Sequence, residues 1–312
     1  MDVAPSARSV NDDDLQTPFV GHLPGFREQC EARGTNYPDD NHYIAHLQAA
    51  WRRLLDSPAS QDESLVQEFL ERHSSLLPGP FSVDGTSGHV PFPMALISKP
   101  KLPGLSSREP DFMWIATDSG SVYAVLIEIE TPHKRWFQTA NRTESHSEFT
   151  HAQGQLADWR AWLDRPADHS AFLDLYEVPT ELRHRKLEPR FVLIHGRRAE
   201  YEGDTARTNK KAALARDGER LMSFDRLTPD RDALAFACVK KDEHGYRAHR
   251  VPPTLAVFSH GDEYQLVRGW DEVLDGCPDM TATRRDYLRE VLRGQIRTGA
   301  DSDMPWQHVE WL

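Results

Sequence analysis

Three acidic residues of this sequence stand where carboxylates can support metal-dependent chemistry. Asp111 begins one apolar run, and Glu128 and Glu130 end the next. Side chains two apart on a strand point to the same side, so Glu128 and Glu130 are expected to project together. If the two runs pair as a hairpin, Asp111 approaches the same sheet edge. Three carboxylates with no obvious cation among them predict a hard-oxygen site suited to Mg²⁺ or Mn²⁺.

This pattern has two explanations. Charge at the end of an apolar run is costly unless it is solvated, paired or bound to a cation. A bound divalent ion would polarise phosphoryl oxygens and lower the pKa of a water molecule. The simpler explanation is that acids at strand ends are a solvated edge. The pattern alone leaves both open.

A second candidate group lies on the helix expected from residue 146 to 163. Its apolar stripe has helical spacing and consists of Phe149, Ala152, Leu156, Trp159 and Leu163. Gln155 falls at the border of that stripe, where its amide would hold a substrate phosphate or a water. The alternative is an ordinary polar residue at a helix border.

The elements that must position these residues form a mixed pattern. Residues 1–40 are predicted to be a tail, because they contain an acidic run, several prolines and glycines, and little apolar periodicity. Two helices follow, the second capped by Asp62 or Ser64. The hairpin turn is expected at 118–120. The other expected elements are one or two weak strands within 78–108, strands at 191–195, 221–227, 233–239 and 254–258, and helices at 205–221 and 281–297. This order predicts an α/β fold with a central mixed sheet flanked by helices.

Composition narrows the class of protein. The 312 residues carry 37 basic and 49 acidic side chains, a net charge of −12, which argues against non-specific coating of nucleic acid or anionic lipid. No apolar run approaches the roughly 20 residues of a spanning helix. The three cysteines are far apart and form no CxxC pair, so we expect neither disulfides nor a thiolate zinc site. The N-terminus lacks a secretory pattern, and a cytoplasmic location is predicted.

Several segments, in order, resemble the PD-(D/E)xK nucleases and, more closely, the Shedu domain of bacterial anti-phage defence. They lie between about residues 65 and 230, roughly half the chain. They are ValGlnGluPheLeuGluArgHisSerSerLeuLeuProGly (66–79), GluProAspPhe (109–112), LeuIleGluIleGluThrPro (126–132), HisAlaGlnGlyGlnLeuAlaAspTrp (151–159), PheValLeuIleHisGlyArgArg (191–198) and MetSerPheAspArgLeu (222–227).

The resemblance implies a restriction-endonuclease-like core that cleaves DNA with a divalent metal. By position, Asp111 and Glu128 would be metal ligands and Gln155 the polar residue of the later helix; Glu68 or Glu71 would supply the acid of the opening helix. A homo-oligomer is also implied. The core is expected at 61–232, between an N-terminal extension at 1–60 and a C-terminal extension at 233–312.

One position departs from the nuclease pattern. The motif lysine is replaced by Glu130, which can bind a cation or accept a proton but cannot donate or neutralise. Three explanations stay open: Glu130 is a third metal and catalytic ligand, another lysine such as Lys134 substitutes, or cleavage has been lost. In the last case the chain is an inactive nuclease fold that binds nucleic acid or protein. Apart from these explanations, the chain could be a sensor or scaffold whose function lies in the terminal regions.

Short basic clusters offer a possible DNA contact. They lie at 183–186, 197–198, 210–211 and 240–241. Phosphate contacts need only local positive charge. Ordinary solvated surface is the alternative for each cluster.

Overall fold

A single mixed sheet organises the protein. The computed structural model describes residues 21–34, 37–79, 81, 89–103, 109–139, 143–257 and 263–300. Eight strands of the described residues form one sheet in the order β5-β4-β3-β2-β1-β6-β7-β8. The strands are β1 (Phe92–Ser98), β2 (Phe112–Thr117), β3 (Ser121–Ile129), β4 (Lys186–Ile194), β5 (Glu219–Met222), β6 (Ala237–Asp242), β7 (Gly245–Arg250) and β8 (Val267–Arg268). The predicted α/β class with a central sheet is confirmed.

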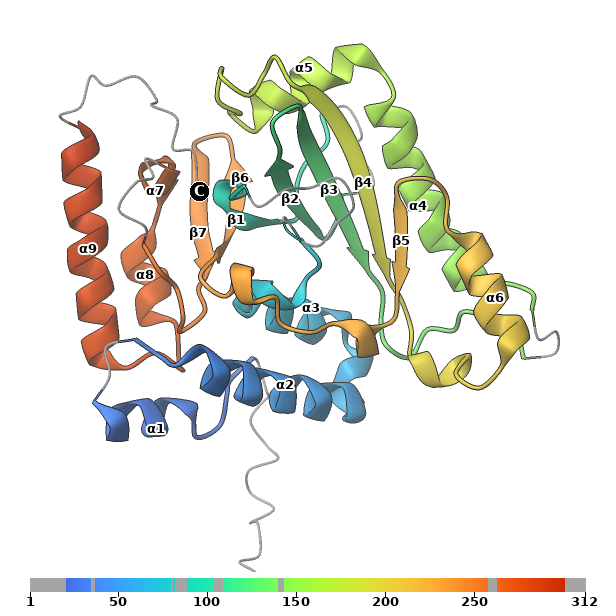
Figure 1. The fold of residues 1–312 in the computed structure, drawn as a ribbon, viewed down its shortest axis with the longest axis horizontal. Coiled ribbons are helices and arrows are strands. Elements are labelled where there is room, and N and C mark those ends of the chain that lie inside the picture. Colours follow the sequence, from blue (N-terminus) through green and yellow to red (C-terminus); the bar gives the residue numbers. More distant parts are fainter. Residues whose placement is uncertain are drawn as a thin grey trace, which may run out of the picture.

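Helices surround this sheet in three groups. In Figure 1, α1, α2 and α3 lie together at the bottom, α4, α5 and α6 lie beside β4 and β5, and α7, α8 and α9 lie beside β7. The helices are α1 (Phe26–Arg33), α2 (Asp40–Asp56), α3 (Glu63–Arg72), α4 (Ser147–Leu163), α5 (Pro166–Leu175), α6 (Thr205–Leu214), α7 (Glu263–Leu266), α8 (Trp270–Asp275) and α9 (Ala282–Ala300). None of these described helices combines the length and apolarity that crossing a membrane requires.

The predicted hairpin is the centre of the sheet. β2 and β3 pair antiparallel, with Thr117 opposite Val122. The turn forms because the Asp118 carboxylate accepts hydrogen bonds from the backbone N–H groups of Gly120 (2.8 Å) and Ser121 (2.7 Å). Every residue of both strands is buried. The hairpin therefore runs through the core. A charged side chain in the middle of it would be cut off from water, so charged residues are expected only at its ends.

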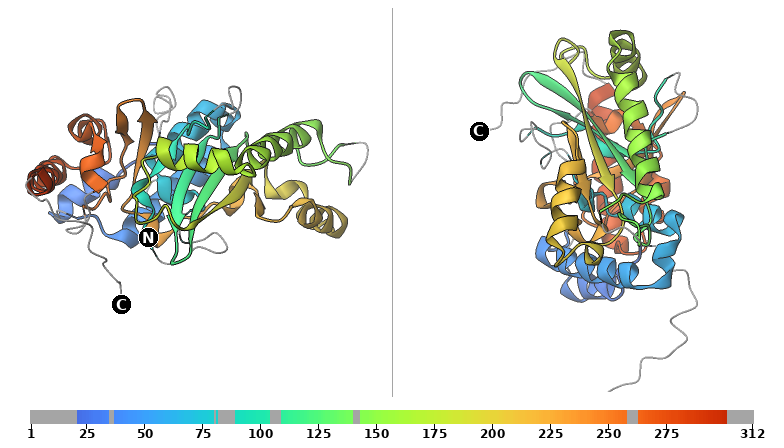
Figure 2. Two further views of the ribbon diagram at one scale, coloured as in Figure 1. Left: turned by 90° about the horizontal axis from the view of Figure 1, so that it is seen from above. Right: turned by 90° about the vertical axis from the view of Figure 1, so that its right-hand side faces the viewer.

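The parallel half of the sheet places α4. β3 pairs with β4 in parallel, and α4 and α5 make the crossover between them. All five residues of the predicted apolar stripe on α4 are buried. Figure 2, turned from the first view, shows α4 lying along one face of the sheet. The stripe fixes the rotation of α4 and therefore the direction in which Gln155 projects.

Three sequence-based predictions need correction. The tail predicted over 1–40 includes α1, where Phe26 is fully buried; residues 1–20 lie outside the described residues. The helix predicted over 205–221 ends at Leu214, because Gly218 and β5 follow. Residues 254–257 of the predicted strand 254–258 form no strand, and residue 258 lies outside the description.

The segment expected as a C-terminal extension continues the same sheet. β6 pairs in parallel with β1, with Ala95 opposite Ala237. β7 pairs antiparallel with β6 and adds the next strand. The sheet therefore passes from the hairpin into residues beyond 233 without a break.

Candidate active site

The register of β2 and β3 brings Asp111 beside Glu128. Phe112 pairs with Ile127 in the antiparallel register. Asp111, just before Phe112, therefore stands opposite Glu128, just after Ile127. The Asp111 backbone N–H donates to the Ile127 carbonyl at 3.1 Å, and its Oδ2 accepts from the Ile129 N–H at 2.7 Å. Asp111 is thus held by the backbone of the strand that carries Glu128, as the hairpin prediction requires.

Glu128 is buried, and only one of its two carboxylate oxygens is hydrogen-bonded. Its Oε1 accepts one hydrogen bond from Gln155 Nε2 at 2.8 Å. Its Oε2 is buried and has no hydrogen-bond partner among the described residues. Burial, with the negative charges of Asp111 and Glu130, raises the pKa of Glu128 well above its ordinary value, while Lys99 acts in the opposite direction. The site holds a carboxylate in an environment that disfavours its charge.

Two lysines lie among these acids. Lys99 follows β1 and forms an ion pair with Asp111 Oδ1, and Lys134 forms one with Glu130 Oε2. Burial alone would lower the pKa of Lys99, but Asp111 and Glu128 raise it. The expectation of carboxylates without a nearby cation is therefore wrong. Lys134, the lysine that sequence reasoning named as a substitute, faces Glu130.

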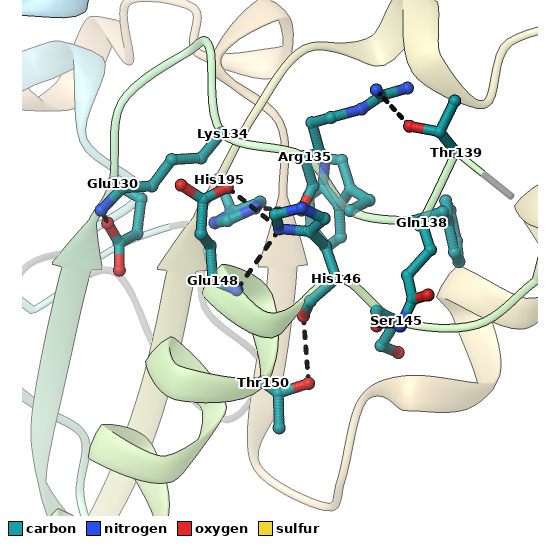
Figure 3. Close-up of polar contacts among 12 residues, drawn as sticks. Glu130, Lys134, Arg135, Gln138, Thr139, Ser145, His146, Glu148, Thr150 and His195 are labelled. Carbon is teal, nitrogen blue, oxygen red and sulfur yellow. Dashed lines mark hydrogen bonds and ion pairs between the residues drawn. The ribbon is translucent and has the colours of Figure 1, made fainter.

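The start of α4 forms the rim beside Lys134. Figure 3 shows Glu130 at the end of β3, with Lys134, His146, Glu148 and His195 close by. His146 Nδ1 lies 3.0 Å from Glu148 Oε2. Glu148 and Glu130 both contribute to raising the pKa of Lys134, against the effect of its burial. Lys134 therefore stays protonated between two acidic elements.

A fourth acid comes from α3. Glu63, in the first turn of that helix, is half-buried, and burial together with the charges of Asp111 and Glu130 raises its pKa. Sequence reasoning instead named Glu68 and Glu71. The structure directs these two elsewhere: Glu68 pairs with Arg72 and Arg250, and Glu71 with His249. We call Asp111, Glu128, Glu130 and Glu63 the carboxylate cluster.

The donor chemistry of the carboxylate cluster suits a hard divalent cation. Its buried side chains present oxygen atoms only, and the unpartnered Oε2 of Glu128 is an acceptor that lacks a positive partner. In the described part of the chain, no group of three or more His, Cys, Asp or Glu side chains stands in ready metal-binding geometry. Asp111 and Glu130 would have to exchange their lysine partners for the ion.

Comparison with known proteins identifies the family. The family model for the C-terminal part of the Shedu protein SduA matches residues 60–228. The chain belongs to the Shedu family. None of the curated proteins gives a significant match.

The Shedu match covers the whole carboxylate cluster. It includes α3, the β2–β3 hairpin and α4, and it stops before β6. Membership of the Shedu family associates the chain with anti-phage defence. β6, β7 and the helices after them lie beyond the matched region.

The basic clusters divide by their partners. In the 197–198 cluster, Arg197 forms ion pairs with Asp225 (2.7 Å) and Asp56 (3.2 Å). Arg183 pairs with Asp174. Lys240, by contrast, has no bonded partner within the described ranges. Because Arg183 and Arg197 are paired with acids, the clusters at 183–186 and 197–198 are weaker candidates for a DNA contact than Lys240.

Proposed function

We propose that this Shedu protein is a metal-dependent DNA endonuclease of anti-phage defence, with a restriction-endonuclease-like core. It would act in the cytoplasm as a homo-oligomer and hydrolyse backbone phosphodiesters of DNA. The observation that carries the proposal is the buried Glu128 carboxylate, which has one oxygen without a partner beside Asp111 and Glu130. Perturbed carboxylates gathered at one sheet edge are typical of functional sites.

Asp111, Glu128 and Glu130 would hold Mg²⁺ or Mn²⁺ in this proposal. A bound divalent ion supplies Lewis acidity and a water of lowered pKa. Asp111 is oriented by the Ile129 N–H and Glu128 by the Gln155 amide. Gln155 thus acts by fixing a carboxylate, in place of the predicted contact with water or substrate.

Lys99 and Lys134 take the part of the absent motif lysine. Both are protonated side chains beside the carboxylate cluster. An ammonium group there offsets negative charge that develops on a phosphoryl group. Because Lys99 pairs with Asp111 at the centre of the cluster, we assign the larger contribution to Lys99.

A plasmid-nicking assay with Mg²⁺ or Mn²⁺ tests the proposal. Asp111→Ala and Glu128→Ala are expected to lower cleavage by a factor of about 100 or more, the usual cost of losing such a group. Glu188→Gln is the matched control, since Glu188 lies on β4 opposite Tyr123, toward the other end of the sheet. Cleavage unchanged by both alanine variants would show that the site is wrong.

The second candidate function is binding without cleavage. It is favoured by the ion pairs of Lys99 with Asp111 and of Lys134 with Glu130, which neutralise two carboxylates within the chain itself. Calorimetry with Mn²⁺ separates the two functions. Absent heat of Mn²⁺ binding, together with retained binding of DNA or a protein partner, would favour the inactive fold.

A further inference from the structure

A cationic pocket lies outside the carboxylate cluster, where α3, β7 and α8 meet. The pocket has a volume of about 400 Å³. Five of its side chains are basic, and one, Glu272, is acidic. We define the cationic pocket by these basic residues: Arg72, Lys240, Arg247, His249 and Arg250. In a chain of net charge −12, this is a local reversal of sign.

A β-bulge gathers the basic residues on one face. Lys240 pairs with Arg247 across β6 and β7, and Cys238 pairs with Arg250. Residues three apart on a regular strand point to opposite sides. Here, however, Arg247 and Arg250 stand opposite Lys240 and Cys238, which are two apart on β6 and therefore point to the same side. The extra residue between these pairs causes this, since a bulge re-aims the side chains that follow it.

The carboxylates near the pocket leave donors unused. Arg247 pairs with Glu272 at 2.6 Å, and Arg72 and Arg250 share Glu68. The Nε groups of Arg72 and Arg250 are nevertheless buried and have no acceptor among the described residues. Three arginines therefore share two carboxylates, so the pocket keeps a net positive charge.

A second buried carboxylate anchors the wall behind the pocket. Glu71 accepts from His249 at 3.0 Å and from the Ser98 hydroxyl. Burial would raise the pKa of Glu71, but the hydrogen bonds from His249 and Ser98 lower it to about 2. Glu71 is therefore charged and fully engaged, and it holds His249 in place.

We propose that the cationic pocket binds the phosphate group of a small phosphorylated molecule. Guanidinium and ammonium groups are acceptor-free donors that match phosphate oxygens. The volume suits a ligand of nucleotide size, and Ala248, Val251 and Val273 provide an apolar side of the pocket. All of the residues that line the pocket except Arg72 lie beyond the region that the Shedu model matches.

Isothermal titration calorimetry on the full chain tests the pocket. The probes are inorganic phosphate, adenosine monophosphate and adenosine, at constant ionic strength and with EDTA to remove divalent ions. Phosphate and the monophosphate are expected to bind and adenosine is not. Tighter binding of the monophosphate identifies a nucleotide, and equal binding identifies recognition of the phosphate group alone.

Charge reversal at the rim provides the second arm. Lys240→Glu is expected to weaken binding of the monophosphate at least tenfold, and Lys240→Glu with Arg247→Glu about a hundredfold. Both residues are exposed, so folding should persist, as circular dichroism will show. The control is Arg52→Glu, the same change of charge at an exposed position of α2. Wild-type binding by the double variant, or adenosine binding as tightly as its monophosphate, would overturn the proposal.

Discussion

Glu71 and Glu128 are buried to the same extent, each with 6% of its surface exposed, yet their environments act in opposite directions. Glu71 accepts hydrogen bonds from Ser98, His249 and Gln67. Glu128 accepts one from Gln155 and faces two further acids. The pKa of Glu71 falls to about 2, and that of Glu128 rises. Burial alone does not reveal the role of a carboxylate; the number of donors and the sign of its neighbours do.

The contrast separates an acid whose hydrogen bonds are satisfied within the chain from one whose hydrogen bonds are not. Glu71 is satisfied within the chain, and its charge helps to hold α3, β1 and β7 together. Glu128 keeps an oxygen without a partner, which a protein that needed only stability would fill or replace. This difference is why the proposed metal site includes Glu128, and why we expect Glu71 to support the fold.

Neutralising Glu71 should have the largest effect on stability. Glu71→Gln is expected to lower the free energy of unfolding by about 3 kcal/mol, because the hydrogen bonds that a buried, charged carboxylate accepts are weakened or lost. Urea unfolding at pH 7 measures this. Since the pKa of Glu71 is lowered, its contribution is present above about pH 4.5 and is lost as the pH falls toward 2. A variant as stable as the wild type would remove Glu71 from its structural role.

Removing the ammonium group beside Asp111 should have the next largest effect. Lys99→Met is expected to reduce plasmid nicking about thirtyfold, or about 2 kcal/mol in the barrier, because negative charge on the phosphoryl group is no longer offset. Lys101→Met is the matched control, as Lys101 is exposed two residues further on. Equal losses in the two variants would point to general electrostatics in place of a specific contact.

Glu128→Gln should stabilise the folded chain, whereas Glu71→Gln should destabilise it. The pKa of Glu128 is about 4.5 in the unfolded chain and is raised in the folded chain. At any pH above about 4.5, this difference therefore lowers the stability of the folded chain. The variant is therefore expected to melt about 2–4 °C higher than the wild type at pH 8 without metal, for a gain of about 1 kcal/mol. The difference should vanish below about pH 4. A lower melting temperature for Glu128→Gln at pH 8 would contradict the view that the surroundings of Glu128 disfavour its charge.

The smallest effect is expected from the amide of Gln155. Gln155→Ala should lower nicking about fivefold, equivalent to about 1 kcal/mol for one hydrogen bond to a carboxylate. Gln153→Ala serves as the control on the same helix, since Gln153 donates to the Leu214 carbonyl at 3.1 Å. If the control loses as much activity, the loss comes from α4 as a whole.

The sequence predicts the part of the cluster that local periodicity determines. Alternation along the hairpin places Asp111, Glu128 and Glu130 at one edge, and helical spacing places Gln155 beside them. Lys99 and Glu63 escape such reasoning, because Lys99 follows a strand in a left-handed conformation (φ 47°) and Glu63 begins a helix whose position depends on packing. Only tertiary structure brings them to the hairpin.

The same limit applies to the fold. The helix predicted from its apolar stripe, α4, is confirmed, as are α2 and the hairpin. The pairing of β6 with β1 joins residues about 140 positions apart, and no local pattern carries that information. The cationic pocket depends on this pairing and on a bulge, so its residues appear in the sequence only as scattered basic positions.

The end of β1 has a mechanical consequence for both sites. Ser98 and Lys99 are successive residues; the first bonds Glu71 behind the cationic pocket, and the second bonds Asp111 in the carboxylate cluster. The Lys99 N–H also donates to the Asp111 carbonyl at 2.8 Å. Any displacement of this short stretch of backbone moves both contacts together. One stretch of backbone therefore supports both the wall behind the cationic pocket and the centre of the carboxylate cluster.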